Sequence, residues 1–311
     1  MRELRLVLAL TNLDNDYQVE QGAAAEHAAG RLDVDLEVIH ADNSAITQSQ
    51  QVLEIIQSRV EPRCDGIILE PVGGTALMQV AKAAAAAGIG WAVLNRDVDY
   101  LADMRATFRV PAFAVTSDHH EIGRIQGRQI GLLLPKGGSV LSIQGPPESL
   151  AAKQRAAGML GSKPADVQVR TMRAAWTEAS AYRVVSSWLR LSTSPQSIVD
   201  VVAAQDDSMA MGARRAFREI TSEWRERWLS LPFLGCDGLP SSGQAWVRKK
   251  SLTATIYVPP NAGTAVEMMV NAIQNGATPP ERTLIAPVPY PELAALTPVT
   301  PGARTFSAHG N

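Results

Sequence analysis

Polar and aromatic residues in this sequence repeatedly follow short apolar runs, at the places where we expect strands to end. Carboxylate, amide and guanidinium groups at such positions can each bridge two neighbouring hydroxyl groups, and an aromatic ring beside them can stack on the apolar face of a sugar. The strand-end set comprises residues 11–17, 70–71, 95–97, 117–118, 144–147, 205–207 and 236–238, with Lys153, Arg155, Trp176 and Tyr257. This composition favours binding of a small ligand that carries several hydroxyl groups.

Catalytic and metal-binding patterns are missing from the sequence. It contains no Gly-x-Ser-x-Gly elbow, no His-Glu-x-x-His motif and no P-loop. His119 and His120 are adjacent, so on a helix they point about 100° apart and chelate one ion poorly. Cys64 and Cys236 lie far apart and outside any Cys-x-x-Cys pair. The acidic residues at the strand ends resemble the two catalytic carboxylates of a glycosidase, but we interpret them as acceptors of hydrogen bonds from ligand hydroxyl groups. We expect no enzymatic activity, no metal and no cofactor.

Short apolar runs alternate with longer helical patterns along the whole chain. We expect strands at 4–10, 35–40, 66–70, 91–95, 112–116, 139–143, 167–172, 198–203, 233–235 and 252–256, and helices at 17–30, 45–60, 74–87, 150–160, 178–191 and 260–275, with further helices after 118 and 207. This alternation predicts βαβ units and parallel sheets. The fold class is therefore α/β, with two doubly wound parallel-sheet lobes whose ligands bind at the carboxyl ends of the strands.

Four residues mark the ends of predicted helices. Asp118, with Glu121 three residues later, has the spacing of a capping box. Asp207 is expected to cap the helix that follows it. Pro260 suits the first turn of the helix at 260–275, and Gly276 suits its end.

The length and composition fit a soluble protein of two domains. The chain has 311 residues, of which 46% are hydrophobic and 19% charged. Its 29 Lys and Arg residues are balanced by 31 Asp and Glu residues, which leaves no positive excess for a nucleic-acid partner. No stretch approaches the roughly 20 apolar residues that cross a bilayer. The apolar run at 6–10 is too short for a secretory signal, so the protein is periplasmic if a signal peptide was removed and cytoplasmic if Met1 is its native start.

Several segments carry a family resemblance. They are 94–96, 117–118 with the helix after it, 151–155, 205–213 and 235–238, in this order along the chain. With them, residues 4–290 resemble the ribose-binding-protein family of periplasmic sugar-binding proteins, whose fold is shared with the effector domains of lac-repressor-like regulators. The resemblance implies a type I periplasmic-binding-protein-like architecture.

The resemblance also implies a set of ligand contacts. These residues are Asn15, Tyr17, Glu70, Asn95, Arg96, Ser117, Arg155, Trp176, Asp206, Asp237 and Tyr257. Five positions depart from the family pattern, which often has Asn at 70, Asp at 95, Asn at 206, an aromatic residue at 236 and Gln at 257. The charges are thus redistributed, which leaves an aldose, a polyol, an amino sugar or another small polar molecule as the ligand.

The family architecture implies three hinge crossings between the lobes. We place them near Ser117, near Tyr257 and Val258, and near Ala286. The N-terminal lobe then comprises residues 1–116 with 258–286, and the C-terminal lobe residues 117–257 with 287–311. Closure by hinge bending around the ligand is expected, and the tail at 297–311 is expected to be extended or loosely ordered.

Two functions fit this reading. The first is a monomeric solute-binding protein that closes on a monosaccharide or similar polyol and delivers it to the membrane permease of an ABC importer. The alternative is a cytoplasmic sugar sensor without a DNA-binding domain of its own. An enzyme acting on a sugar is the least favoured reading.

Overall fold

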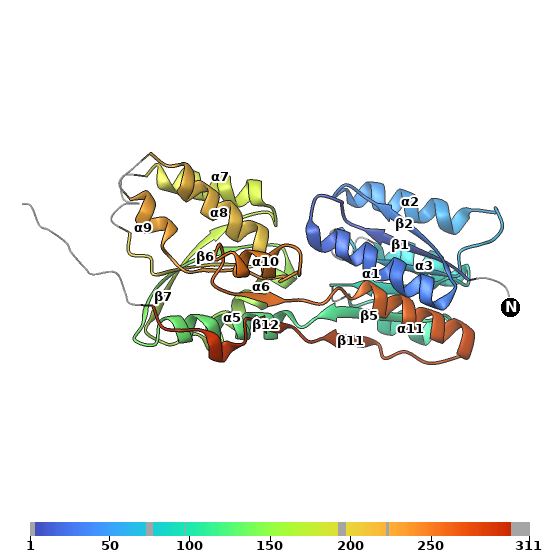
Figure 1. Cartoon of the computed structure of the whole chain (residues 1–311). Helices are drawn as coiled ribbons and strands as arrows, with labels where there is room; N and C mark the ends of the chain where they lie inside the picture. Colours follow the sequence, from blue (N-terminus) through green and yellow to red (C-terminus); the bar gives the residue numbers. More distant parts are fainter. Residues whose placement is uncertain (1–3, 73–76, 97, 192–196, 222–223, 300–311) are drawn as a thin grey trace, which may run out of the picture. The chain divides into compact units, whose positions relative to one another are not determined.

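The protein is described here from a computed structural model, which covers residues 4–72, 77–96, 98–191, 197–221 and 224–299. The described residues form two compact units (Figure 1). Unit 1 contains the described residues up to Asp118 together with Pro259–Ala286, and unit 2 contains His119–Val258 together with the described residues from Pro287 onward. The chain therefore passes between the units three times.

The part of unit 1 that the structure describes is built around a sheet of six parallel strands. Their order is β2 (Asp35–His40), β1 (Arg5–Leu10), β3 (Gly66–Leu69), β4 (Gly90–Leu94), β5 (Ala112–Ser117) and β11 (Arg282–Ile285). β1, β3, β4 and β5 are buried almost throughout, because helices cover both faces of a parallel sheet. The strand order reverses between β1 and β3, which is where open α/β sheets bind ligands.

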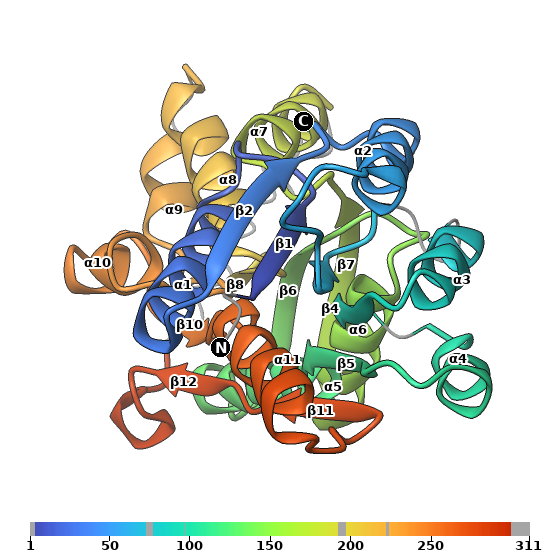
Figure 2. The same ribbon diagram turned by 90° about the vertical axis from the view of Figure 1, so that its right-hand side faces the viewer.

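Among the described residues of unit 1, five helices pack around this sheet (Figure 2). They are α1 (Asp16–Leu32), α2 (Ala45–Gln57), α3 (Met78–Ala86), α4 (Leu101–Thr107) and α11 (Ala262–Asn275). Side chains of α1 and α11 form one core with Leu6, Leu8 and Leu10 of β1. Side chains of α2, α3 and α4 form a second core with the alternate residues Val7 and Ala9. The period of two along β1 thus divides its side chains between the two helical layers.

Unit 2 has a smaller parallel sheet. Its strand order is β7 (Val167–Arg173), β6 (Gly138–Gln144), β8 (Val201–Ala204) and β9 (Phe233–Leu234). β10 (Thr255–Tyr257) pairs antiparallel with β12 (Val288–Tyr290). The helices are α5 (His119–Leu133), α6 (Leu150–Ser162), α7 (Glu178–Leu189), α8 (Asp207–Glu219), α9 (Arg225–Leu229) and α10 (Gly243–Arg248). The order reverses between β6 and β8, beside the start of α8.

Most predicted elements are present, with differences at their ends. The helix predicted at 45–60 ends at Gln57, because Ser58 has left the helical conformation. α11 begins at Ala262, since Asn261 is the N-cap and is held by hydrogen bonds to Gln21. Gly276 ends α11 in the left-handed conformation, as predicted. The sequence pattern missed α4, α10, β11 and β12, and the start predicted for the helix at 74–87 lies outside the described residues.

The prediction that Asp207 caps α8 is wrong. The N-cap is Asp206, whose side chain accepts a hydrogen bond from the Met209 N–H. Asp207 is the first helical residue, and its carboxyl group instead contacts Thr255 and the N–H of Gly238. Two adjacent carboxylates thus have different partners, which lie on different segments of unit 2.

Candidate ligand-binding site

The predicted site residues of unit 1 lie at the carboxyl ends of its strands. Glu70 directly follows β3 and Asn95 directly follows β4. Both are buried, at 8% exposure each, together with Gln18, Gln21 and Asn261. We call these five residues the amide cluster. Buried polar groups require hydrogen-bond partners, and these five supply them to one another.

The amide cluster is a continuous chain of hydrogen bonds that ends on one carboxylate oxygen. Glu70 Oε2 accepts from Gln18 Nε2 at 2.9 Å and from Asn95 Nδ2 at 3.0 Å. Asn95 Oδ1 accepts from Asn261 Nδ2 at 2.6 Å, and Asn261 Oδ1 accepts from Gln21 Nε2 at 2.8 Å. Residues from α1, β3, β4 and the start of α11 are therefore fixed relative to one another. The other carboxylate oxygen of Glu70 accepts no hydrogen bond from the described residues.

Backbone conformation also fixes Asn95. Its φ of 55° lies in the left-handed region, which Asn tolerates better than most residues. Its N–H donates to the Val115 carbonyl at 3.1 Å, which ties it to β5. The side chain is thereby directed to Glu70 and Asn261 rather than along the strand.

The other predicted residues of unit 1 do not join the amide cluster directly. Asn15 caps α1, where its Oδ1 accepts from the Tyr17 N–H at 2.8 Å, and the Tyr17 hydroxyl donates to the Pro259 carbonyl at 3.4 Å. Two buried polar atoms, Nε of Arg96 and Oγ of Ser117, have no partner among the described residues. Asp97 of the predicted strand-end set lies outside the described residues.

Arg155 is the centre of the predicted site residues in unit 2. It stands on α6 and is 8% exposed. Its Nη1 donates to the Gln205 carbonyl and lies 3.8 Å from Oδ1 of Asp237. Its guanidinium carbon lies 5.5 Å from the centroid of the Trp176 ring, within cation–π range, and its Nε donates to Nδ1 of His119 at 3.4 Å.

Close packing of α5 on α6 positions Arg155. A Cβ on Gly123 of α5 would lie 2.1 Å from the carbonyl oxygen of Arg155, so only glycine permits this approach. Gln205 adds a second restraint, because its Nε2 donates to the Ala152 carbonyl of α6 at 3.0 Å. The backbone of α6 around Arg155 is therefore held by two contacts, one with α5 and one with Gln205.

Asp206 presents a buried acceptor. It is 2% exposed, and its Oδ1 accepts from the Met209 N–H at 2.5 Å. Its Oδ2 is buried without a partner among the described residues. Burial raises the pKa of Asp206 to about 6, although the Met209 N–H and the charge of Arg155 favour its ionised form. The start of α8 adds the positive end of a helix dipole beside this carboxylate.

Asp237 and Trp176 are both held in left-handed backbone conformations, with φ of 99° and 58°. Backbone hydrogen bonds link Asp237 to the β10 segment, from its N–H to the Ile256 carbonyl at 3.0 Å and from the Val258 N–H to its carbonyl at 2.9 Å. Tyr257 and Asp237 form an isolated parallel β-bridge. The ring of Trp176 lies against Gly145 at the end of β6.

The structure thus groups Glu70 with Asn95 in unit 1, and Arg155 with Trp176, Asp206, Asp237 and Tyr257 in unit 2. Sequence reasoning missed Gln18, Gln21, Asn261 and His119. The one available signal for Gln18 and Gln21 is their spacing of three within an otherwise Ala-rich helix, which places both on one face. That face is buried.

Other kinds of site find no support in the part of the chain that the structure describes. No group of three or more His, Cys, Asp or Glu side chains there could hold a metal ion. Cys64 and Cys236 are free thiols. Among the described helices, none has the length and apolar character needed to cross a bilayer.

Comparison with known proteins identifies the family. The family model of the periplasmic binding protein domain matches residues 6–278. The ribose import binding protein of Bacillus subtilis (strain 168) is 24% identical over 259 residues, which cover 83% of this chain and 77% of that protein. The D-apiose import binding protein of Paraburkholderia graminis is 25% identical over 280 residues, which cover 88% and 82%.

A solved structure has the same fold. The periplasmic solute binding protein of an ABC transporter from Actinobacillus succinogenes 130z, with bound D-allose, superposes with a TM-score of 0.79 at 24% identity, over 92% of this chain and 97% of that one. The predicted α/β fold class and the resemblance to ribose-binding proteins are confirmed. The chain belongs to the periplasmic binding protein domain family, a family of binding proteins.

Proposed function

We propose that this protein is a solute-binding protein that captures a monosaccharide or similar polyol and delivers it to an ABC importer. The observation that carries the proposal is the unpartnered Oδ2 of Asp206 at the carboxyl end of the unit 2 sheet. A buried acceptor without a partner costs about 1–3 kcal/mol. A ligand hydroxyl that donates to this oxygen would remove that cost, so Oδ2 is suited to accept a hydrogen bond from a hydroxyl group.

The surrounding groups support a ligand with several hydroxyls. Arg155 offers planar donors, Asp237 offers acceptors, and Trp176 offers an aromatic face close to both. In unit 1, Glu70 retains one carboxylate oxygen that the described residues leave unbonded. Relatives of this chain are named for ribose and D-apiose, and the compared structure holds D-allose, which are all small polyhydroxylated molecules.

The complete ligand-binding set that we propose draws on both units. It comprises Asn15, Tyr17, Glu70, Asn95, Arg96, Ser117, Arg155, Trp176, Asp206, Asp237 and Tyr257. Hinge bending at the three passages of the chain is the movement that we propose for ligand capture and release. A ligand whose hydroxyl groups are placed differently would leave one of these buried polar groups without a hydrogen-bond partner, which gives such a site its selectivity.

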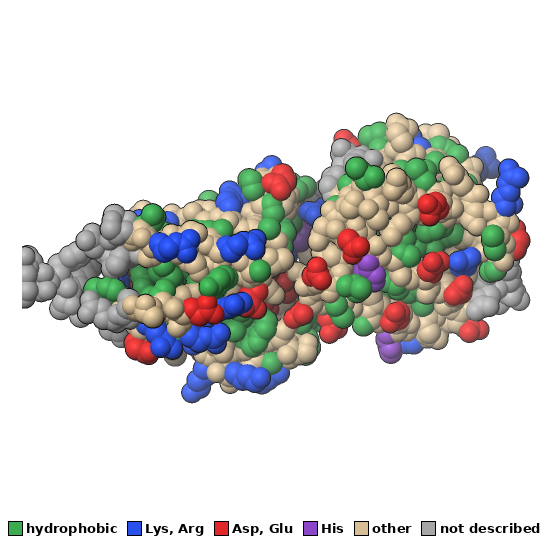
Figure 3. All heavy atoms as spheres, turned by 90° about the horizontal axis from the view of Figure 1, so that it is seen from above, with side chains coloured by type: hydrophobic (Ala, Val, Ile, Leu, Met, Phe, Trp, Pro, Cys, Tyr) green, Lys and Arg blue, Asp and Glu red, His purple; other side chains and the backbone are tan. Residues whose placement is uncertain are grey.

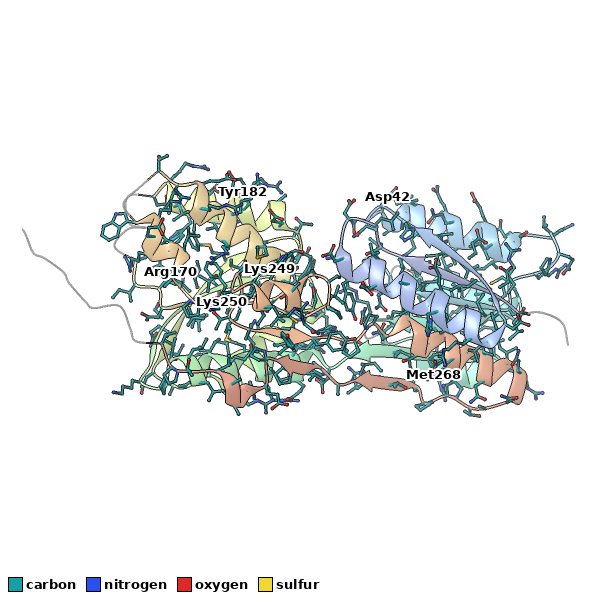
Figure 4. The ribbon with its side chains drawn as sticks, in the orientation of Figure 1. Asp42, Arg170, Tyr182, Lys249, Lys250 and Met268 are labelled. Carbon is teal, nitrogen blue, oxygen red and sulfur yellow. The ribbon has the colours of Figure 1, made fainter. Side chains whose placement is uncertain are left out.

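Charge distinguishes the surfaces that would meet the importer. Unit 1 carries 10 Lys and Arg against 19 Asp and Glu, and unit 2 carries 19 against 12. On the face in Figure 3, Asp and Glu prevail over unit 1 and Lys and Arg over unit 2. Figure 4 labels the exposed Arg170, Lys249 and Lys250 of unit 2 and the exposed Asp42 of unit 1. We propose that the permease presents charges of opposite sign to each unit, so that docking weakens as salt rises.

Further parts of the proposal concern the state of the protein in the cell. We propose that it acts in the periplasm as a monomer, returns its ligand chemically unchanged and needs no nucleic acid or cofactor. Light scattering of the purified chain tests the monomer. Incubation with the bound sugar, followed by NMR, tests turnover, and appearance of a product would contradict a pure binding function.

Titration calorimetry against a panel of sugars tests the ligand class. The panel contains D-ribose, D-allose, D-apiose, myo-inositol and D-glucosamine, and we expect saturable heat for at least one of them. Arg155→Ala is expected to weaken binding by about 2–4 kcal/mol, because the carboxylate of Asp237 loses its charged neighbour. Lys153→Ala is the matched control, since it removes a positive charge from an exposed position on the same helix.

Two different results would contradict two different parts of the proposal. Absence of heat for every sugar and polyol would overturn the ligand class. Normal binding by the Arg155 variant would show that the ligand lies elsewhere.

A further inference from the structure

A polar cavity lies in unit 2, among segments that contribute nothing to the proposed ligand-binding set. Its volume is about 340 Å³, which is within the range of small-molecule sites. It is lined by Arg214 of α8, by residues 229–232 at the end of α9, by residues of the segment 250–253 after α10, and by residues of the segment 291–299. We call it the Arg214 cavity. All of these residues belong to unit 2.

The lining of the Arg214 cavity combines positive charge with hydroxyl groups. Arg214 and Lys250 both contribute to it, and none of the described residues that line it is an Asp or a Glu. Glu292, which adjoins the lining in the sequence, is exposed and is not part of it. Further donors are the hydroxyl groups of Ser251, Thr253 and Thr297. Such a lining is suited to an anion.

Arg214 is a half-buried cation without a carboxylate partner among the described residues. The next residue, Arg215, pairs with two glutamates. Burial lowers the pKa of Arg214, and the charge of Arg218 lowers it further, yet an arginine stays protonated in proteins. The described residues around Arg214 therefore leave its charge uncompensated, and a bound anion would compensate it.

The guanidinium group of Arg214 is already fixed in place. Its Nη1 donates to the Leu229 carbonyl at 3.2 Å, and its guanidinium carbon lies 5.1 Å from the centroid of the Phe233 ring. These two contacts restrict the side chain before any ligand arrives. The entropic cost of ordering it on binding is therefore small.

Lys250 stands at a backbone position that favours glycine. Its φ is 59°, in the left-handed region, and its N–H donates to the Val247 carbonyl at 2.9 Å. Its side chain is exposed (labelled in Figure 4) and lines the Arg214 cavity. The charge of Lys250 can therefore be removed by a substitution that suits the backbone.

We propose that the Arg214 cavity binds a small phosphomonoester. A phosphate group carries about two negative charges and three acceptor oxygens, so it can accept from Arg214, from Lys250 and from the lining hydroxyl groups together. A carboxylate has two oxygens in one plane and matches fewer of these donors. Apolar side chains also line the cavity and can contact the organic part of the ligand; they include Leu133, Leu231 and Leu296.

Titration calorimetry tests the chemical class of this ligand. The probes are glycerol 3-phosphate, inorganic phosphate and acetate, with sodium chloride holding the ionic strength constant. We expect saturable binding of glycerol 3-phosphate, weaker binding of inorganic phosphate and no saturable binding of acetate. Binding of inorganic phosphate alone would overturn the assignment to a phosphomonoester. Binding of neither phosphate, or equal binding of acetate, would overturn the site.

Two arginines of α8 separate a site from general attraction to positive charge. Arg214→Gln should weaken binding of glycerol 3-phosphate by about tenfold or more, because charge-assisted hydrogen bonds are lost. Arg218→Gln is the matched control, since it removes the same charge from an exposed residue one turn later that does not line the cavity. Its effect should stay below about threefold. Equal losses in the two variants would overturn the site.

Lys250→Gly tests the same site in a variant whose backbone suits its position. Glycine adopts a φ of 59° without strain, so the melting temperature should stay constant or rise, while the affinity for glycerol 3-phosphate should fall about fivefold or more. Lys249→Ala is the control, because Lys249 is exposed and does not line the cavity. Sugar affinity should be unchanged in all four variants. Unaltered phosphate binding in Lys250→Gly would count against this site alone, and failure of the whole sugar panel would count against the proposed function alone.

Discussion

Glu70 offers the sharpest test of the amide cluster. Its Oε2 is the acceptor for two buried amide donors, from Gln18 and Asn95. Glu70→Ala leaves both donors without an acceptor, at about 1–3 kcal/mol each. Gln18 and Asn95 are 6% and 8% exposed, so a water molecule can reach them and moderate the loss. We therefore expect unit 1 to lose about 2–4 kcal/mol of unfolding free energy.

Glu70→Gln tests the negative charge of Glu70 separately from its role as a hydrogen-bond acceptor. Its amide oxygen can still accept both hydrogen bonds, but neutral bonds are weaker than charge-assisted ones, so the expected loss is about 1–2 kcal/mol. Urea unfolding gives the free energies, and hydrogen exchange of β1, β3 and β4 assigns the loss to unit 1. Glu26→Ala, at an exposed position of α1, is the control. If Glu70→Ala costs no more than Glu26→Ala, the amide cluster does not stabilise unit 1 in the way described.

Three further predictions concern other parts of the molecule. Burial raises the pKa of Asp206 to about 6 and that of Asp207 to about 8, from an ordinary value of 3.8. Both groups therefore stabilise the fold in their neutral forms, and the melting temperature should fall as pH rises from 4 to 9. A melting temperature that does not change with pH would contradict this. Gly145→Ala should displace Trp176, because the ring would lie 2.2 Å from the new Cβ, and it should weaken sugar binding at least tenfold. The control is Gly161→Ala, whose new Cβ meets no atom within 4 Å and which should bind normally. Calorimetry measures the affinity of both variants, and tryptophan fluorescence reports on Trp176. Gly123→Ala should separate α6 from α5 and lower stability by about 1–3 kcal/mol, and an unfolding midpoint unchanged in urea would refute the close approach.

The fold could be predicted from the sequence because most of its strands are buried on both faces. Such strands read as continuous apolar runs, as β1 and β4 do. β11 lies at the edge of the unit 1 sheet and exposes every second residue, so its run is interrupted. α4 has only seven residues, too few for a clear helical period. The missed elements are thus those in which local pattern is weak and tertiary pairing decides the structure.

The site could be predicted where a residue lies within a few positions of a strand end. Glu70 and Asn95 directly follow β3 and β4, Asp206 lies two residues after β8, and Asp237 lies three residues after β9. The exchange of roles between Asp206 and Asp207 was not predictable, because Gly235, Gly243 and Thr255 enclose Asp207 from distant segments. Asn261 likewise meets Gln21 across 240 residues of sequence. Neither juxtaposition leaves a local pattern.

The amide cluster also has a definite direction. Gln21 Oε1 accepts from the backbone N–H groups of Asn261 and Ala262, at 2.8 Å each, so its amide cannot be turned round without losing both bonds. At the other end, a carboxylate can only accept. Every amide between these ends has one permitted orientation, and the donors and acceptors of unit 1 are therefore set during folding. An arriving sugar meets groups whose rotational freedom is already lost, which lowers the entropic cost of binding and favours those hydroxyl patterns that match a fixed polarity.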